Sequence, residues 1–166
     1  MVHKNLSMIA AVGKNHELGL CGDLVWRINE DLQFFRKTTL GHYIVMGRRT
    51  YDSLPPTLKD RRYLVIASEN DFVPRTDDVV VFKTLDAFLS FAKTVAEEIF
   101  VIGGGMIYTA LLPYSNKMIL TEINDTNDRA DVFFPKFDKS QWVSEKILDT
   151  QSDDGIKYSR KIYTRR

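Results

Sequence analysis

The sequence contains one cysteine, few prolines and no long apolar run. A lone thiol, Cys21, cannot form an internal disulfide, and this composition fits a reducing compartment. The five prolines are scattered and mark no linker, so the chain is expected to form one domain, residues 1–166. The apolar run from Leu6 to Val12 is soon followed by Lys14 and is too short for a signal peptide or a membrane span. We therefore expect a cytoplasmic protein that does not bind membranes.

An excess of either charge is also missing, since 23 Lys and Arg residues accompany 22 Asp and Glu residues. Nucleic-acid binders usually carry a basic face, so no nucleic-acid partner is expected. The three histidines His3, His16 and His42 have no Cys or His partners at metal-ligand spacing, so no metal site is predicted. The GxSxG motif of hydrolases and the GxxxxGK[ST] motif of NTPases are absent as well.

Short runs rich in Val and Ile alternate with segments of helical periodicity, which predicts an α/β fold. The expected parallel strands are Leu6–Val12, Tyr43–Gly47, Tyr63–Ala67, Val79–Phe82 and Ile99–Ile102. The expected helices are Glu30 to about Thr39 with Asn29 as its cap, Arg49–Leu54, Leu85–Val95 capped by Thr84, and Met106–Leu112 ended by Pro113.

The alternation stops after the fourth helix. Three further strands follow, at Met118–Ile123, Trp142–Leu148 and Ile156–Thr164, and the turn-rich segment Asp149–Gly155 joins the last two into an antiparallel hairpin. The predicted fold is therefore a single domain with an eight-stranded, mainly parallel sheet. It has an antiparallel C-terminal edge hairpin and four helices on its faces.

Ligands of open α/β sheets bind beyond the carboxyl ends of the strands, so the residues after each strand are the candidates for a site. Gly13–Leu24 follows the first strand and is either a plain surface loop or a mobile lid, because it is long and contains three glycines. Gly47-Arg48-Arg49-Thr50 follows the second strand. Its arginines could bind a phosphate at a helix start, or they could be solvated surface side chains.

Two further strand ends carry candidate nucleotide-binding residues. Ser68 and Glu69 follow the third strand, and an acidic side chain there could take the ribose hydroxyls of NAD. Gly103–Gly105 opens the fourth helix and is either a phosphate cradle or a tight turn. It is not the dinucleotide fingerprint, because Tyr108 stands where the third glycine belongs.

Asp31 is the most informative carboxylate in the chain. Near a helix start, an acidic residue is ordinarily a surface group that compensates the helix dipole. Yet Phe34 and Phe35 share its helix face at i+3 and i+4, and Trp26 lies just upstream. A carboxylate among aromatic side chains is well suited to binding a ligand or promoting its protonation. Both interpretations remain open on these residues alone.

Taken together, the segments resemble dihydrofolate reductase of the bacterial type over essentially the whole chain. The matching segments are Ser7-Met8-Ile9-Ala10-Ala11, Leu18-Gly19, Trp26, Asp31-Leu32, Phe35, Thr39-Leu40, Val45-Met46-Gly47-Arg48, Thr50, Val101-Ile102-Gly103-Gly104-Gly105, Ile107-Tyr108, Leu120-Thr121 and Phe134-Pro135. Each is weak alone, but their common order and spacing are specific.

The resemblance implies that the chain reduces 7,8-dihydrofolate with NADPH as a monomer. Asp31, with Trp26 and Thr121, would form the catalytic group that orients the pterin and promotes protonation of its ring, with water as the carrier. The resemblance assigns Arg61 to the glutamate tail of the substrate. The other substrate-binding residues it implies are Ile9, Leu32, Phe35, Leu54, Ile102 and Tyr108.

The same resemblance implies an NADPH site at the strand ends. Arg48, Arg49, Thr50 and Ser68 would hold the adenosine phosphates, and Gly103-Gly104 is expected to be a cis peptide. The further cofactor-binding residues are Ala11, Gly19, Leu20, Gly47, Lys83, Gly105, Met106 and Ile107, and the Gly13–Leu24 loop would close over the nicotinamide side.

Two departures from the family pattern concern this site. Val25 replaces the proline that usually precedes the tryptophan, which removes a restraint on the backbone where the loop ends. Met106 stands where some relatives carry a basic residue, so one phosphate contact is expected to be missing, and Glu69 also weakens the expected preference for NADPH.

Two alternatives compete with dihydrofolate reduction. A reductase of the same fold could act on another pterin or on a riboflavin precursor, but Arg61 has a role only if the substrate carries a glutamate tail. A non-catalytic nucleotide-binding module would keep Arg48 and the glycines and would need neither Asp31 nor Trp26.

Overall fold

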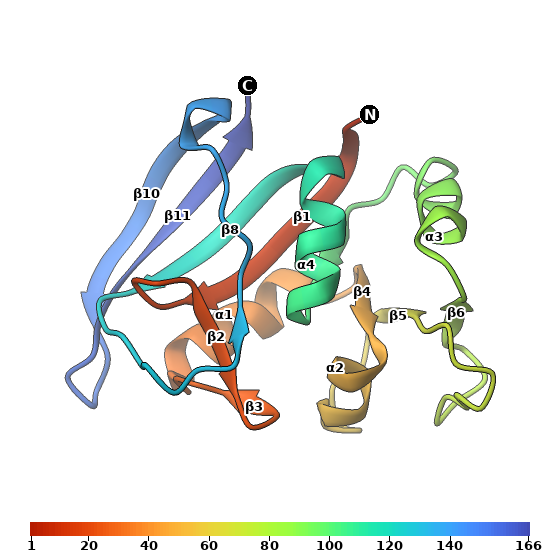
Figure 1. Ribbon diagram of the computed structural model, residues 1–166, viewed down its shortest axis with the longest axis horizontal. Helices are drawn as coiled ribbons and strands as arrows, with labels where there is room; N and C mark the ends of the chain where they lie inside the picture. The colour runs from red at the N-terminus through yellow and green to blue at the C-terminus, as the bar shows by residue number, and fades with distance from the viewer.

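The computed structural model describes residues 1–166 and shows one large sheet, one small sheet and four α-helices (Figure 1). The strands are β1 (His3–Val12), β2 (Glu17–Leu20), β3 (Asp23–Leu24), β4 (Tyr43–Gly47), β5 (Arg62–Ile66), β6 (Val80–Phe82), β7 (Ile99–Val101), β8 (Ser115–Ile123), β9 (Val132–Phe133), β10 (Trp142–Gln151) and β11 (Lys157–Arg165). The helices are α1 (Asn29–Thr39), α2 (Arg48–Ser53), α3 (Leu85–Ala92) and α4 (Gly105–Leu111).

The eight-stranded sheet has the order β10-β11-β8-β1-β7-β4-β5-β6. Every neighbouring pair from β8 to β6 is parallel, whereas β11 is antiparallel to both β8 and β10. The predicted sheet with its antiparallel C-terminal hairpin is therefore confirmed. Because β1 lies between β7 and β8, the carboxyl ends of these strands and of β4 meet at one edge (Figure 1).

Apolar side chains of alternate residues build a core on each face of this sheet. In β1, Leu6 and Met8 belong to the cluster under α3 and α4, while Ile9 belongs to the cluster under α1 and α2. Since successive side chains of a strand point to opposite faces, a strand buried on both faces must be apolar throughout. This requirement explains why the short Val- and Ile-rich runs predicted the central strands.

The segment 13–24 is not an irregular loop, which corrects the sequence-based expectation. It contains β2 and β3, which form a small three-stranded sheet with β9 in the order β3-β2-β9. Glu17 fastens it, since its buried carboxylate accepts hydrogen bonds from the backbone N–H groups of Asn15 (2.8 Å) and Asn127 (2.7 Å). β2 and β3 were missed because they are short, and because β9, the second partner of β2, lies more than a hundred residues away in the sequence.

The two predicted helix caps, on α1 and α3, have different outcomes. α1 starts at Asn29, and Ile28 precedes it without any side-chain cap, so the predicted cap by Asn29 is wrong. Thr84 does cap α3, since its side chain accepts a hydrogen bond from the Ala87 N–H at 3.1 Å. That helix ends at Ala92, three residues before the predicted end.

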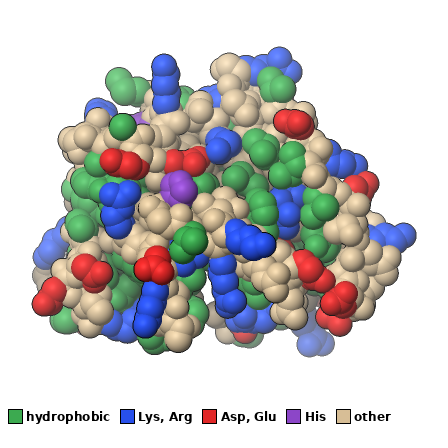
Figure 2. Space-filling view, turned by 180° about the vertical axis from the view of Figure 1, so that it is seen from behind, with side chains coloured by type: hydrophobic (Ala, Val, Ile, Leu, Met, Phe, Trp, Pro, Cys, Tyr) green, Lys and Arg blue, Asp and Glu red, His purple; other side chains and the backbone are tan.

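The molecular surface mixes both charges. Figure 2 shows basic and acidic side chains interspersed over one face, with apolar patches between them. No α-helix of the structure has the length and apolar character needed to cross a bilayer.

Replacing Glu17 with Gln should destabilise the fold by about 1–3 kcal/mol at neutral pH. One of the two backbone N–H groups that now bind the carboxylate would then face the NH2 group of the amide, which cannot accept a hydrogen bond. Burial alone would raise the pKa of Glu17, but the N–H groups of Asn127 and Asn15 outweigh it and hold the pKa below 4.5. The carboxylate's contribution is therefore complete above about pH 4.5 and is lost as the pH falls through the lower folded-state pKa.

Urea unfolding of the wild type and Glu17→Gln from neutral to acidic pH measures the difference in their free energies of unfolding. This difference should become smaller only at the acidic end. Glu145→Gln, an exposed position on β10, is the matched control and should change stability little at any pH. A Glu17→Gln protein as stable as the wild type at neutral pH would contradict the role of this carboxylate.

Candidate active site

Asp31 on α1 is held by side chains from two neighbouring strands. Its Oδ1 accepts hydrogen bonds from the Thr121 hydroxyl on β8 (2.5 Å) and from Nη2 of Arg160 on β11 (2.6 Å). Thr121 and Arg160 are directly paired across β8 and β11, and Arg160 Nε donates to Thr121 Oγ1 at 3.2 Å. The three side chains thus form one closed network, and Asp31 is not the solvated helix-start acid of the simpler interpretation.

Arg160 is the residue of this network that the sequence analysis missed. Its side chain is only 6% exposed, that of Asp31 is 16% exposed, and the guanidinium carbon lies 3.7 Å from the centre of the Phe34 ring. Its neighbours at i−2 and i+2, Tyr158 and Ile162, pack into apolar clusters. An arginine at an inward position of an alternating strand was the available signal.

Apolar side chains surround the network on the α1 face of the sheet. Phe35, Leu54 and Ile102 pack against the cluster that contains Ile9, and Leu32 is half-buried next to Asp31 in the chain. The buried Tyr108 hydroxyl donates to the Ile9 carbonyl at 2.7 Å, and burial raises the pKa of this phenol. A carbonyl oxygen has two lone pairs, so Ile9 can accept a second hydrogen bond.

Trp26 and Ala11 lie at the same end of the sheet. Trp26 packs with Ala11 against the small cluster that contains Tyr158, and its Nε1 donates to Asp125 Oδ2 at 3.1 Å. Ala11 is the direct β1 partner of Thr121. Ala11, Thr121 and Arg160 therefore form one row across three neighbouring strands.

Arg61, in the loop between α2 and β5, joins this loop to the carboxyl end of α1. Its Nε donates to Thr39 Oγ1 at 3.1 Å, and its two Nη atoms donate to the carbonyls of Lys59 and Arg36. Burial lowers the pKa of this guanidinium below its ordinary value. An arginine has five N–H donors, so two remain for a ligand.

The glycine turn lies beside the end of β4. The Gly47 N–H donates to the Gly103 carbonyl at 3.0 Å, which places Gly47-Arg48-Arg49-Thr50 next to Gly103–Gly105. The Gly103-Gly104 peptide is cis, as expected from the resemblance, and Gly103 has a φ of +123°. A Cβ at Gly105 would lie 2.9 Å from Val132 Cγ1, so β9 packs directly on this turn.

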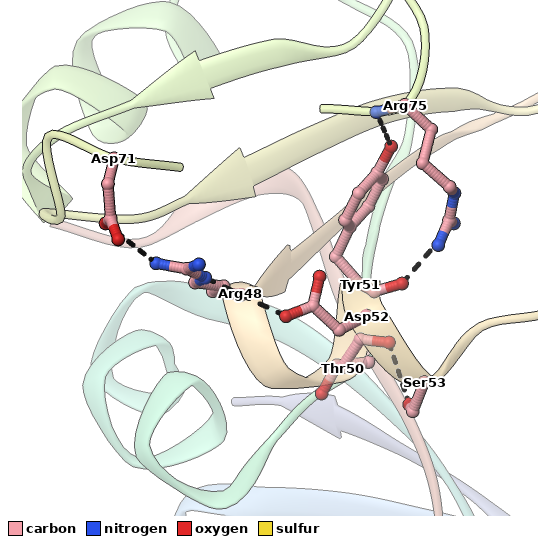
Figure 3. A network of polar contacts seen from close by, with 7 residues as sticks. All are labelled: Arg48, Thr50, Tyr51, Asp52, Ser53, Asp71 and Arg75. Carbon is pink, nitrogen blue, oxygen red and sulfur yellow. Dashed lines mark hydrogen bonds and ion pairs between the residues drawn. The ribbon is translucent and has the colours of Figure 1, made fainter. Parts of the chain in front are cut away.

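The Arg48 guanidinium is directed toward two carboxylates, those of Asp52 and Asp71 (Figure 3). Its Nη1 lies 3.2 Å from Asp71 Oδ1 and its Nε 3.8 Å from Asp52 Oδ2. Both carboxylates are largely exposed, so these ion pairs are weak and Arg48 remains able to bind a phosphate. Thr50 directs its hydroxyl to the turn, since Oγ1 would lie 3.5 Å from a Cβ at Gly103 or Gly104.

The other predicted cofactor residues lie at the surface or on β2. The side chains of Arg49, Ser68, Lys83 and Met106 are exposed, and Lys83 Nζ donates to Asn70 Oδ1 at 2.8 Å. Ile107 packs on Gly47, where a Cβ would lie 3.1 Å from Ile107 Cγ1. Gly19 and Leu20 belong to β2, with Gly19 between β3 and β9.

The arrangement matches a known family over nearly its full length. The family model described as dihydrofolate reductase matches residues 5–165. The chain belongs to the dihydrofolate reductase family. It is 36% identical over 158 residues to dihydrofolate reductase of Bacillus subtilis, with 95% of this chain and 89% of the relative covered. It is 33% identical over 162 residues to that of Neisseria meningitidis serogroup B, covering 96% and 98%.

A solved dihydrofolate reductase has the same fold. The enzyme from Enterococcus faecalis, complexed with NADP(H) and RAB-propyl, superposes with a TM-score of 0.82 at 27% identity, covering 99% of this chain and 98% of that one. Dihydrofolate reductases use NADPH. In open α/β sheets ligands bind beyond the carboxyl ends of the strands, which here include the ends of β1, β4, β7 and β8.

Replacing Arg48 with Ala should weaken NADPH more than NADH, because the two cofactors differ only in the 2′-phosphate that this guanidinium would bind. Losing one charge-assisted contact should cost NADPH about tenfold or more in KM. Steady-state kinetics with both cofactors measure the ratio. Arg75→Ala is the control, because Arg75 belongs to the same polar network but contacts only Tyr51 (Figure 3). Equal losses with NADPH and NADH would contradict a 2′-phosphate role for Arg48.

Proposed function

We propose that this chain reduces 7,8-dihydrofolate to 5,6,7,8-tetrahydrofolate with NADPH, and that Asp31 is the carboxylate that binds the pterin. The observation that carries the proposal is the environment of Asp31. A largely buried carboxylate is costly unless it is paired, and here Thr121 and Arg160 both bind Oδ1 while no protein group binds Oδ2. Oδ2 is therefore available for ring N–H groups.

Each residue of the site has a task in this proposal. Asp31 accepts hydrogen bonds from the pterin ring and orients it, and Ile9 and Ile102 offer backbone carbonyls. Leu32, Phe35 and Leu54 wall the ring and exclude water. The negative charge of Asp31 favours protonation of the ring nitrogen next to the carbon that receives hydride, with water carrying the proton. Trp26 packs beside this end of the sheet and limits access of solvent.

The residues at the strand ends fit NADPH, which supplies the hydride when it is bound. The backbone at Gly103 and Gly104 has no side chain that would obstruct a pyrophosphate, and Thr50 adds a hydroxyl beside it. Arg48 and Arg49 start α2 and supply the positive charge that phosphates require. Ser68, Lys83, Met106 and Ile107 would complete the adenosine side, and Ala11, Gly19 and Leu20 the nicotinamide side.

Arg61 favours a substrate with a glutamate tail. It lies at the carboxyl end of α1, the same helix that carries Asp31 at its start, and keeps two donors free for a carboxylate. We further propose that the enzyme works as a monomer in the cytoplasm, which fits its single, exposed thiol. A dimer at assay concentration in sedimentation equilibrium would contradict the monomer.

Replacing Asp31 with Asn should nearly abolish turnover near neutral pH and leave NADPH binding almost unchanged. The amide carries no negative charge and has only one acceptor oxygen, so it cannot replace the carboxylate toward the pterin. The assay follows NADPH oxidation with and without dihydrofolate, and calorimetry measures NADPH binding. Glu30→Gln is the control, since Glu30 is the exposed neighbour on the same helix turn. Wild-type turnover from Asp31→Asn would refute the assignment of Asp31, and no dihydrofolate-dependent oxidation by the wild type would refute the proposed function.

Replacing Arg61 with Ala should raise the KM for dihydrofolate by tenfold or more and barely affect a dihydropterin that lacks the glutamate tail, because a charge-assisted contact contributes about 1.5–3 kcal/mol. Arg62→Ala, which removes an exposed arginine stacked on Tyr43, is the control for charge. Equal losses for both substrates would show that Arg61 acts only on the fold.

A further inference from the structure

Arg160 brings a fixed positive charge into the site proposed for the pterin. Its guanidinium contacts one group from each of three directions, namely Asp31 Oδ1 at 2.6 Å, Thr121 Oγ1 at 3.2 Å and the Phe34 ring at 3.7 Å. Only 6% of its side chain is exposed, so the guanidinium is shielded from solvent on most sides. The charge is therefore held at a defined position relative to Asp31.

A role in stability alone does not require this arginine. Burying a charged pair costs solvation free energy, and apolar residues of similar volume often stabilise a fold as well or better. The neighbours of Arg160 on the same strand face, Tyr158 and Ile162, are already apolar. Unlike an apolar side chain, the guanidinium orients Asp31, because it binds Oδ1 and leaves Oδ2 without a protein partner.

We propose that Arg160 is a positioning residue for dihydrofolate reduction, which orients Asp31 and sets the charge that the pterin meets. This inference rests on the proposed role of Asp31. Arg160 offsets part of the charge of Asp31 through Oδ1, so the pterin meets a paired carboxylate whose free oxygen, Oδ2, is directed, instead of an isolated anion. Thr121, which donates to Asp31 and accepts from Arg160, keeps the two partners in register.

The surrounding charges make the effect of Arg160 on protonation predictable in sign. Around the Tyr158 phenol, Glu30 of α1, Asp31 and Asp153 of the β10–β11 turn are acidic, and Arg160 is the cation among these four groups. Burial raises the pKa of the Tyr158 phenol, with further upward contributions from the acidic groups, so Tyr158 is uncharged near neutral pH. Without Arg160, the substrate ring nitrogen would bind a proton more readily, because a nearby positive charge opposes protonation.

The test is the pH profile of single-turnover hydride transfer, measured with saturating NADPH and dihydrofolate over the range in which the protein stays folded. Arg160→Met, which keeps the length and removes the charge, should move the midpoint of the profile to higher pH by about 1 unit or more. Since removing a cation eases protonation at every nearby group, the direction is the same for an acidic or a basic limb. Arg160→Lys should restore the wild-type midpoint but show a several-fold lower rate constant of hydride transfer than the wild type. Its ammonium keeps the charge but lacks the planar guanidinium that binds Asp31 and Thr121 together.

Arg165→Met is the matched control on the same strand. Arg165 is also partly buried and stacked on an aromatic ring, that of Trp142, but it binds only the backbone carbonyls of Ser115 and Leu112. It should leave the midpoint unchanged. If Arg160→Met does not fold, Arg160→Gln gives the same comparison, because its amide can still bind Thr121 without a charge.

Several outcomes would overturn the inference. Arg160 would only support the fold if Arg160→Met left the midpoint of the pH profile at its wild-type value or moved it to lower pH. The same conclusion would follow if Arg165→Met moved the midpoint equally, or if Arg160→Lys did not restore it. Failure of the underlying function is distinguishable, because then Asp31→Asn would retain turnover or the wild type would not oxidise NADPH with dihydrofolate at all.

Discussion

The parallel pairing of β1 with β7 on one side and with β8 on the other is the interaction on which the site depends. It brings Ile9, Ile102 and Thr121 to the same edge of the sheet, although they are far apart in the sequence. The adjacent pairing of β7 with β4 adds the glycine turn and the arginines at the start of α2. Both ligand-binding regions are therefore consequences of one strand order.

Burial of the Asp31 carboxylate is the second constraint, and it connects three elements. α1 supplies the carboxylate, β8 the hydroxyl and β11 the guanidinium, so the antiparallel C-terminal hairpin takes part in the site as well as closing the sheet. An unpaired buried charge would be strongly unfavourable. The position of α1 against the sheet is thus coupled to the charge at the site.

The sequence was sufficient to predict the fold where burial on both sheet faces leaves a pattern, and β4 was predicted with its observed ends, Tyr43–Gly47. It was insufficient for β2, β3 and β9, which are too short to show a period. Glu17 of β2 binds the Asn127 N–H just before β9, and these two residues are more than a hundred positions apart in the sequence. Asp31 could be singled out through its aromatic neighbours and the family pattern. Arg160 was missed, because an arginine in a strand is ordinarily exposed. Its place between Tyr158 and Ile162 was the one signal, and its partners become visible only in three dimensions.

The packing of β9 has a consequence for motion. β9 pairs with β2 on one side, while Val132 and Phe133 lie against Gly105 on the other, where a Cβ would come within 2.9 Å of Val132. Glu17 also ties the hairpin to Asn127, just before β9. β9 therefore connects β2 and β3, which the proposed function assigns to the nicotinamide side, with the Gly103–Gly105 turn, which it assigns to the pyrophosphate. Any displacement of β2 and β3 would have to be accommodated at β9, because Val132 packs so closely on Gly105 that no Cβ fits between them.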